Sequence, residues 1–156
     1  MKKSLYLKLL KKTIIMKVLV LCTGNSCRSQ MAHGFLKSFD PNMVVYSGGT
    51  KPEKQINPFA VKVMQDVGID ISNHTPVHVD EYLDKAFDYV ITVCDDAKET
   101  CPVFSGKVSS RVHMGFEDPV KYKGKDDEIL RHYQRIRDQI FERLKDFYNE
   151  RILSQI

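Results

Sequence analysis

One segment near the start of the chain, from Cys22 to Ser29, constrains the fold more than any other. It reads Cys-Thr-Gly-Asn-Ser-Cys-Arg-Ser and follows the apolar run Val18–Leu21, which is typical of a buried strand. Apolar residues at helical spacing come after it, so the segment is predicted to be a turn from a strand into a helix. Backbone N–H groups converge at such a turn, and with the helix dipole they favour a tetrahedral oxyanion.

The side chains of this turn predict a cysteine nucleophile at Cys22. An anion-binding turn also favours a thiolate, so we expect a lowered pKa for Cys22 and an ionised thiol near neutral pH. Arg28 offers a planar guanidinium that binds two oxygens of one anion, and Ser29 is expected to donate its hydroxyl to the Cys22 sulfur. A structural cysteine in a glycine turn would not explain an arginine and a hydroxyl donor at this spacing.

The rest of the turn is predicted to bind the substrate. Gly24 is expected to adopt a positive φ that turns the amides inward, and Asn25 is among the few other residues that tolerate it. Asn25 is interpreted as shaping the loop, and Cys27 as a packing cysteine, with a protective disulfide to Cys22 as the alternative. The expected substrate-binding residues are Thr23, Gly24, Asn25, Ser26, Cys27, Arg28 and Ser29.

Strand-like and helical patterns alternate along the remaining chain. Strands are predicted at Val18–Leu21, Val44–Tyr46, Tyr89–Val93 and Arg111–Met114. Helices are predicted from Ser29 to Asp40, from Asn57 to Gly68, from Asp80 to Ala86, and from Asp126 to about Ile152. This alternation predicts a single-domain α/β fold, a parallel four-stranded sheet with helices on both faces. Cys22, Cys94 and Asp118 each follow a predicted strand end, where such folds bind ligands.

The length of the chain fits one domain, and the distribution of its charges argues against nucleic acid as a partner. The 156 residues fit one domain that folds without disulfides. Residues 1–15 hold five lysines and no acid, which leaves 19 of the 24 basic residues against 20 acidic ones in residues 16–156. Residues 16–156 therefore lack the excess of positive charge that is typical of nucleic-acid-binding domains. No apolar run is long enough to span a membrane.

Residues 1–15 are interpreted as a basic N-terminal extension, with Met16 as an alternative start. The segment resembles the beginning of a secretory signal but has no small-residue cleavage site, so a cytoplasmic protein is expected. A basic amphipathic helix that binds an acidic membrane or a partner is the alternative for this segment.

Two further cysteines, Cys94 and Cys101, frame a polar segment. If that segment were helical, the seven-residue separation would place their Cα atoms about 10.5 Å apart, whereas a disulfide needs about 5.5–6 Å. A bond between them would require the segment to unwind, which its polar composition makes easy. Spaced cysteines in a reducing compartment are more often catalytic or metal-binding than structural, although two unrelated thiols remain the alternative on spacing alone.

A zinc site built from Cys22, Cys27, Cys94 and Cys101 is another interpretation of these cysteines. The six residues between Cys94 and Cys101 exceed the usual two to four between paired ligands, and the other two ligands would occupy the anion-binding turn. No bound metal or cofactor is therefore predicted.

Several motifs together resemble the thioredoxin-coupled arsenate reductases, which share the low-molecular-weight tyrosine phosphatase fold. The likeness covers essentially the whole chain from Met16 onward. It is carried by the turn continued to Ala32, the pair Cys94 and Cys101, and the segments Tyr46–Gly49, Ile71–Thr75 and Gly115–Pro119. The turn alone would not separate a reductase from a phosphatase, but the distal cysteines do.

The resemblance implies a relay of three thiols. Cys22 would attack arsenate held by Arg28 and the loop amides, while Asp118 would protonate the departing oxygen. Cys94 would attack the Cys22 adduct and release arsenite, and Cys101 would then attack Cys94. The Cys94–Cys101 disulfide would be reduced by thioredoxin, the expected partner. Without the resemblance the role of Asp118 is undecided, because Asp-Pro is a common turn opener.

The sequence also departs from its apparent relatives. Some of them bind potassium through a glutamate and an aspartate where this chain has His33 and Val77, so no potassium site is predicted. Phosphatase relatives place aromatic residues directly after the Asp-Pro, whereas this chain has Val120 and Lys121 before Tyr122. A phosphotyrosine phosphatase, acting through Cys22, Arg28 and Asp118 alone, is the alternative function.

Overall fold

Four parallel strands form the sheet of the computed structural model, which describes residue 2 and residues 14–156. The strands are β1 (Lys17–Cys22), β2 (Val44–Gly49), β3 (Phe87–Thr92) and β4 (Val108–His113), in the order β2-β1-β3-β4. The register pairs Cys22 with Gly49 at the carboxyl ends of β1 and β2. The predicted parallel four-stranded sheet is confirmed. Most of the extension at 1–15 lies outside the described residues.

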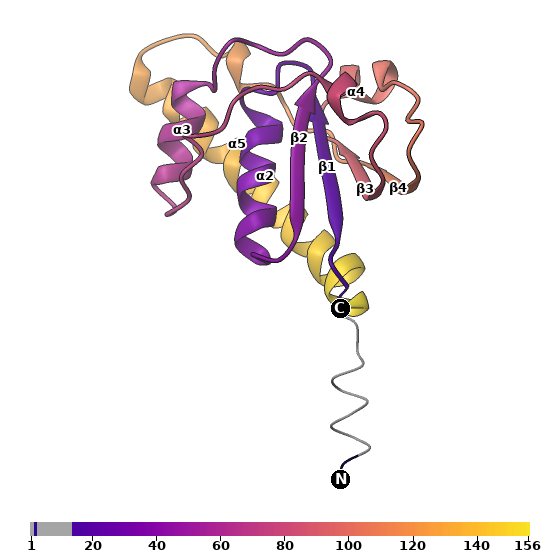
Figure 1. Cartoon of the computed structure of the whole chain (residues 1–156). Coiled ribbons are helices and arrows are strands. Elements are labelled where there is room, and N and C mark those ends of the chain that lie inside the picture. Colours follow the sequence, from indigo (N-terminus) through magenta and orange to yellow (C-terminus); the bar gives the residue numbers. More distant parts are fainter. Residues whose placement is uncertain (1, 3–13) are drawn as a thin grey trace.

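Helices cover both sides of this sheet (Figure 1). The α-helices are α2 (Arg28–Phe39), α3 (Pro58–Gln65), α4 (Asp95–Thr100) and α5 (Asp126–Phe147). Figure 1 shows α2, α3 and α5 together on one side of the strands and α4 on the other, near the end of β3. Of the helices in the described part of the chain, none combines the length and apolar character that crossing a membrane requires.

The core forms where β1 and the apolar stripes of the long helices meet. Val18–Leu21 are fully buried, as expected for a central strand that is covered on both faces. The predicted stripe of α5 is also buried, at Tyr133, Ile136, Ile140, Leu144 and Phe147. Because β1 lies between β2 and β3, its carboxyl end is held on both sides by neighbouring strands.

Short connecting elements complete the chain. They are η1 (Val79–Tyr82), η2 (Pro119–Lys121), η3 (Tyr148–Ile152) and η4 (Leu153–Gln155). η2 begins directly after Asp118, whose side chain accepts a hydrogen bond from the Val120 amide. The last predicted helix is thus α-helical only to Phe147, and it continues as the wider turn η3.

The helix predicted from Asp80 to Ala86 is wrong, because only the short turn η1 forms there. The carbonyl of Leu83 accepts hydrogen bonds from the amides of Ser105 and Gly106 instead of from a following helical turn. This tertiary contact leads the chain directly into β3. The predicted strands are at the right places but shifted, since β2 extends to Gly49 and β4 ends one residue before Met114.

Asn57 fixes the start of α3 and ties it to α5. Its Oδ1 accepts a hydrogen bond of 2.9 Å from the Phe59 amide, and its Nδ2 donates one of 3.0 Å to the Tyr133 hydroxyl. We expect Asn57→Ala to lower the free energy of unfolding by about 1–2 kcal/mol, because both the cap and the interhelical bond are lost.

Urea unfolding followed by circular dichroism measures this effect. The matched control is Asn42→Ala, an exposed position that should change the free energy of unfolding by less than about 0.5 kcal/mol. Equal stability of the two variants would contradict the assignment of Asn57 as a structural cap.

Candidate active site

A cavity of about 270 Å³ opens at the carboxyl end of β1. The turn from β1 into α2 forms its floor, and segments that follow β2 and β4 form its walls. Its lining residues are Cys22, Thr23, Gly24, Asn25, Ser26, Cys27, Arg28, Lys51, Glu53, Asp118 and Val120. The structure therefore brings most of the predicted site residues together in one cavity. Ser29 lies buried behind the turn and touches Cys22.

The sulfur of Cys22 is held by two hydrogen-bonding groups. Its Sγ lies 2.8 Å from the Ser29 hydroxyl and accepts a hydrogen bond of 3.1 Å from the Asn25 amide. The Asn25 side chain donates to the Ser29 oxygen at 2.8 Å. The Ser29 hydrogen is therefore free to point at the sulfur, and Ser29 is the donor. This contact is the one that the sequence predicts.

Burial opposes the ionisation of Cys22. It raises the pKa of the Cys22 thiol and outweighs the hydrogen bonds of Ser29 and Asn25 and the positive charge of Arg28, which all lower it. The prediction of a lowered pKa is therefore wrong. The physical reason is the desolvation of a sulfur that is only 3% exposed. Nucleophilic chemistry at this position consequently depends on the hydrogen bonds that stabilise the thiolate.

Asn25, rather than Gly24, provides the left-handed turn of the loop. Asn25 has a φ of 48°, the only positive value at a non-glycine position among the described residues, whereas Gly24 is not in this region. The expectation for Gly24 is thus wrong. Space at Gly24 is tight, because a Cβ atom there would lie 3.1 Å from Cγ of Glu53. Gly24 thus lies close to Glu53, whereas Asn25 reverses the direction of the backbone.

A chain of hydrogen bonds supports Asn25 from behind. The Val77 amide donates to Asn25 Oδ1 at 2.9 Å, and Gln30 Nε2 donates to the Asn25 carbonyl at 3.0 Å. Gln30 Oε1 in turn accepts from His74 Nδ1 at 2.8 Å. His33 lies beside this chain, with its ring centroid 4.6 Å from that of His74. Burial lowers the pKa of His33 to about 4, so this residue is neutral.

Arg28 and Asp118 form an ion pair at the wall of the cavity. Arg28 donates a hydrogen bond of 3.0 Å to the Phe116 carbonyl, and its other terminal nitrogen lies 3.5 Å from Asp118 Oδ2. The Arg28 side chain is 12% exposed and that of Asp118 is 48% exposed. The guanidinium is thus fixed beside the loop, and a carboxyl group lies at the rim, where it meets both the cavity and water.

The structure places Cys94 beside the loop and Cys101 at the far end of a short helix. Cys94 Sγ lies 3.4 Å from the Thr23 hydroxyl, and it caps α4 by accepting a hydrogen bond from the Ala97 amide. Cys101 ends α4 and is half-buried. All four cysteines are free thiols. The segment between the two cysteines is helical, which is the geometry that requires unwinding before a disulfide forms.

The structure also bears on the role of Cys27 and on the zinc site considered above. Cys27 is buried, and burial raises its pKa well above the ordinary value, so it is a protonated packing residue. Within residue 2 and residues 14–156, no three His, Cys, Asp or Glu side chains gather in a way that would hold a metal ion.

Lys51, Glu53 and Val120 line the cavity but were not identified from the sequence. The first two follow the end of β2, so the rule that ligand sites lie at carboxyl ends of strands would have pointed to them. Their segment is bound to the loop, because the amides of Lys51 and Glu53 donate to the carbonyls of Thr23 and Gly24. Gly49 permits this approach, since a Cβ atom there would lie 2.4 Å from the Thr23 carbonyl oxygen.

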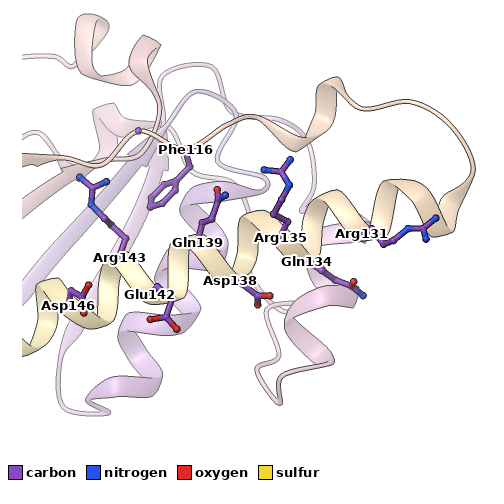
Figure 2. A pocket seen from close by; sticks show the side chains of 10 residues that line it. Phe116, Arg131, Gln134, Arg135, Asp138, Gln139, Glu142, Arg143 and Asp146 are labelled. Carbon is purple, nitrogen blue, oxygen red and sulfur yellow. The ribbon is translucent and has the colours of Figure 1, made fainter.

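A larger hollow of about 840 Å³ lies along α5 (Figure 2). Figure 2 shows Phe116 reaching toward α5 between Arg143 and Gln139. The other side chains that line it are mostly charged and belong to α5, and no cysteine is among them. Size alone would favour this hollow, but the smaller cavity contains the nucleophile, the fixed guanidinium and the rim carboxyl group.

Comparisons with known proteins agree with this geometry. A match to the family described as "Low molecular weight phosphotyrosine protein phosphatase" covers residues 17–155. A protein of Bacillus subtilis (strain 168) named arsenate reductase is 46% identical over 128 residues, which are 81% of this chain and 91% of that protein. An arsenate reductase of Bacillus licheniformis is 46% identical over 138 residues, or 88% of this chain and 95% of that protein.

Solved structures have the same fold. The structure described as "An arsenate reductase in the phosphate binding state" has a TM-score of 0.73 at 30% identity and covers 87% of this chain and 98% of its own. The low molecular weight protein tyrosine phosphatase of T. tengcongensis has a TM-score of 0.72 at 23% identity, covering 86% of this chain and 99% of its own, and it supports the fold alone.

The hydrogen bond from Ser29 should control how fast Cys22 reacts with an alkylating reagent. Ser29→Ala removes a donor to the sulfur while burial still disfavours the thiolate, so the pKa of Cys22 should rise further. We expect alkylation of Cys22 by iodoacetamide at pH 7 to slow by at least about tenfold, because a hydrogen bond to a charged group contributes about 1.5–3 kcal/mol. Peptide mass spectrometry measures the rate at this site.

The control variant is Ser105→Ala, an exposed serine that is remote from the loop in sequence and bonds only to the Leu83 carbonyl. It should leave the alkylation rate of Cys22 unchanged. An unchanged rate in Ser29→Ala as well would show that this hydroxyl does not stabilise the thiolate.

Proposed function

The chain belongs to the low molecular weight phosphotyrosine protein phosphatase family, and from this premise we propose that it reduces arsenate to arsenite through Cys22, Cys94 and Cys101. The observation that carries the proposal is the second thiol beside the loop, with Cys94 Sγ 3.4 Å from the hydroxyl of the residue that follows Cys22. A phosphatase needs no thiol at this place. Relatives at 42–48% identity carry the name arsenate reductase, which agrees with a redox function.

The first step forms a bond between sulfur and arsenic. Cys22, deprotonated with the help of Ser29, attacks arsenate that is bound by Arg28 and the loop from Thr23 to Ser29. One arsenic–oxygen bond breaks, and Asp118 donates the proton with which that oxygen leaves as water. The position of Asp118 at the rim, 3.5 Å from the guanidinium that would bind the anion, supports this role because the carboxyl group meets both the cavity and water.

The second step reduces the arsenic. The Cys94 thiolate attacks the Cys22 sulfur, a Cys22–Cys94 disulfide forms, and the sulfur–arsenic bond breaks with its electron pair staying on arsenic. Arsenic(V) becomes arsenic(III) and leaves as arsenite, while two thiols become one disulfide. The placement of Cys94 next to Thr23 supports this step, because Cys22 ends β1 and Cys94 follows the end of β3, which is the neighbouring parallel strand.

The third step moves the disulfide outward. Cys101 attacks the Cys94 sulfur, a Cys94–Cys101 disulfide forms, and Cys22 is released as a thiolate. α4 must unwind for this step, because a seven-residue helical separation is about 10.5 Å and a disulfide needs about 5.5–6 Å. Only Ala97 of the six α4 residues is buried, so the helix loses little packing when it opens.

Thioredoxin is the proposed external reductant, and the reaction requires no bound cofactor. Thioredoxin would reduce the Cys94–Cys101 disulfide by thiol–disulfide exchange and return both thiols. The cytoplasm is the proposed compartment, because its thiol pool keeps all the cysteines reduced between turnovers.

The phosphatase alternative uses the same loop, so a variant of Cys94 distinguishes the two functions. We expect Cys94→Ser to abolish arsenite release, with a loss of at least about a thousandfold, because the other thiol that lines the cavity, Cys27, is buried and held protonated. Its slow hydrolysis of p-nitrophenyl phosphate should stay within about twofold of the unmodified protein. Arsenite is measured by chromatography coupled to elemental mass spectrometry, and retained arsenite release would refute the relay.

The complete cycle is tested with thioredoxin, thioredoxin reductase and NADPH. The protein should oxidise NADPH only when arsenate is present, and Cys101→Ser should release one arsenite and then stop with a Cys22–Cys94 disulfide. Mass spectrometry of the quenched protein identifies that bond. Absence of arsenate-dependent NADPH oxidation by the folded protein would count against the proposed function and favour a phosphatase.

A further inference from the structure

Arg111 on β4 contacts the third cysteine of the relay. Its terminal nitrogen donates a hydrogen bond of 3.4 Å to Cys101 Sγ. The guanidinium carbon also lies 5.3 Å from the centroid of the Phe104 ring, which is buried. The guanidinium therefore packs over the Phe104 ring, while one of the N–H groups of Arg111 reaches the Cys101 sulfur.

This contact ties the end of α4 to β4, as does the pair that Asp95 of α4 forms with His113 of β4 at 3.0 Å. Cys101 ends α4, whereas Arg111 belongs to the edge strand β4, ten residues later. Arg111 forms no ion pair with an acidic side chain among the described residues. Its positive charge is therefore not neutralised by a carboxylate and is directed at the sulfur.

We propose that Arg111 is a positioning residue for the third step of the relay, holding Cys101 on the β4 side of α4 and stabilising its thiolate. The inference rests on the proposed function, because Cys101 has to act as a nucleophile only if the relay operates. No other cysteine of the chain has a hydrogen bond from an arginine among the described contacts.

The exchange balances without any further reactant. Cys101 gives up its proton to solvent and attacks Cys94, the Cys94–Cys101 bond forms, and the Cys22–Cys94 bond breaks. The electron pair of the broken bond stays on Cys22 as a thiolate. Arg111 therefore stabilises the attacking anion, whereas Ser29 and Asn25 stabilise the leaving one. Each end of the exchange has donors of its own.

The position of Arg111 indicates that it takes no part in the first two steps. Arg111 does not line the cavity that holds Cys22 and Arg28. Loss of its charge should therefore leave arsenate binding and the first disulfide unchanged and slow only the transfer to Cys101. A change in substrate binding would appear in KM, whereas a slower transfer appears in kcat.

The experiment follows one turnover in time. Full-length protein is mixed with arsenate in the absence of thioredoxin, quenched with acid, alkylated, and analysed by mass spectrometry for each disulfide. In Arg111→Met we expect arsenite release at the normal rate but about tenfold slower conversion of Cys22–Cys94 into Cys94–Cys101, since the attacking thiolate loses a charge-assisted hydrogen bond.

Two further variants distinguish an electrostatic role from a structural one. Arg111→Lys keeps the charge and should recover most of the transfer rate. Lys107→Met removes an exposed cation just before the same strand and should have no effect. Thermal unfolding verifies that each variant is folded. In steady-state turnover with thioredoxin, kcat of Arg111→Met should fall while KM for arsenate does not rise.

The outcomes separate this inference from the proposed function. If the unmodified protein forms no Cys22–Cys94 disulfide with arsenate, the relay fails, and the role of Arg111 fails with it. If the unmodified protein completes the relay and Arg111→Met transfers the disulfide equally fast, only the role of Arg111 is overturned. Failure of Arg111→Lys to restore transfer would overturn the electrostatic role.

Discussion

The left-handed backbone of Asn25 is the constraint on which the site depends. With φ at 48°, it folds the loop so that the Asn25 amide points at the Cys22 sulfur and its side chain reaches Ser29. This conformation is costly for a residue with a side chain, and hydrogen bonds from Val77 and Gln30 hold it in place. These hydrogen bonds fix the backbone of the loop, so in the proposed function the binding of an oxyanion would have little backbone left to order.

The order of the strands explains how distant residues meet at this loop. β1 is central, so the segments that follow β2 and β3 lie on either side of Cys22. Glu53 comes from one side and Cys94 from the other. Cys94 is held at a strand end, but the helix that begins there buries only Ala97. A rigid nucleophile next to a weakly packed helix suits a relay in which one sulfur stays fixed and another moves.

The sequence was sufficient for the fold and for the resemblance to arsenate reductases, and the structure and comparisons confirm both. Its local patterns were informative because the Cys22 turn combines a buried strand, a helix start and unusual side chains within eight residues. The sequence missed what depends on tertiary contacts. The carbonyl of Leu83 bonds to Ser105, which ends η1 early, and burial governs the pKa of Cys22, which no local motif reveals.

The loop cannot by itself decide between ester hydrolysis and reduction, since phosphate and arsenate have the same shape and charge. After the first attack the two chemistries differ only in what reaches the adduct. Water must approach from the open side of the cavity, whereas Cys94 approaches from beside Thr23, within the protein. In the proposed relay, a thiol held beside the loop would have a high effective concentration, and arsenic(V), unlike phosphorus(V), accepts the electron pair. Selectivity for arsenate would then reside in the second thiol rather than in the anion-binding loop.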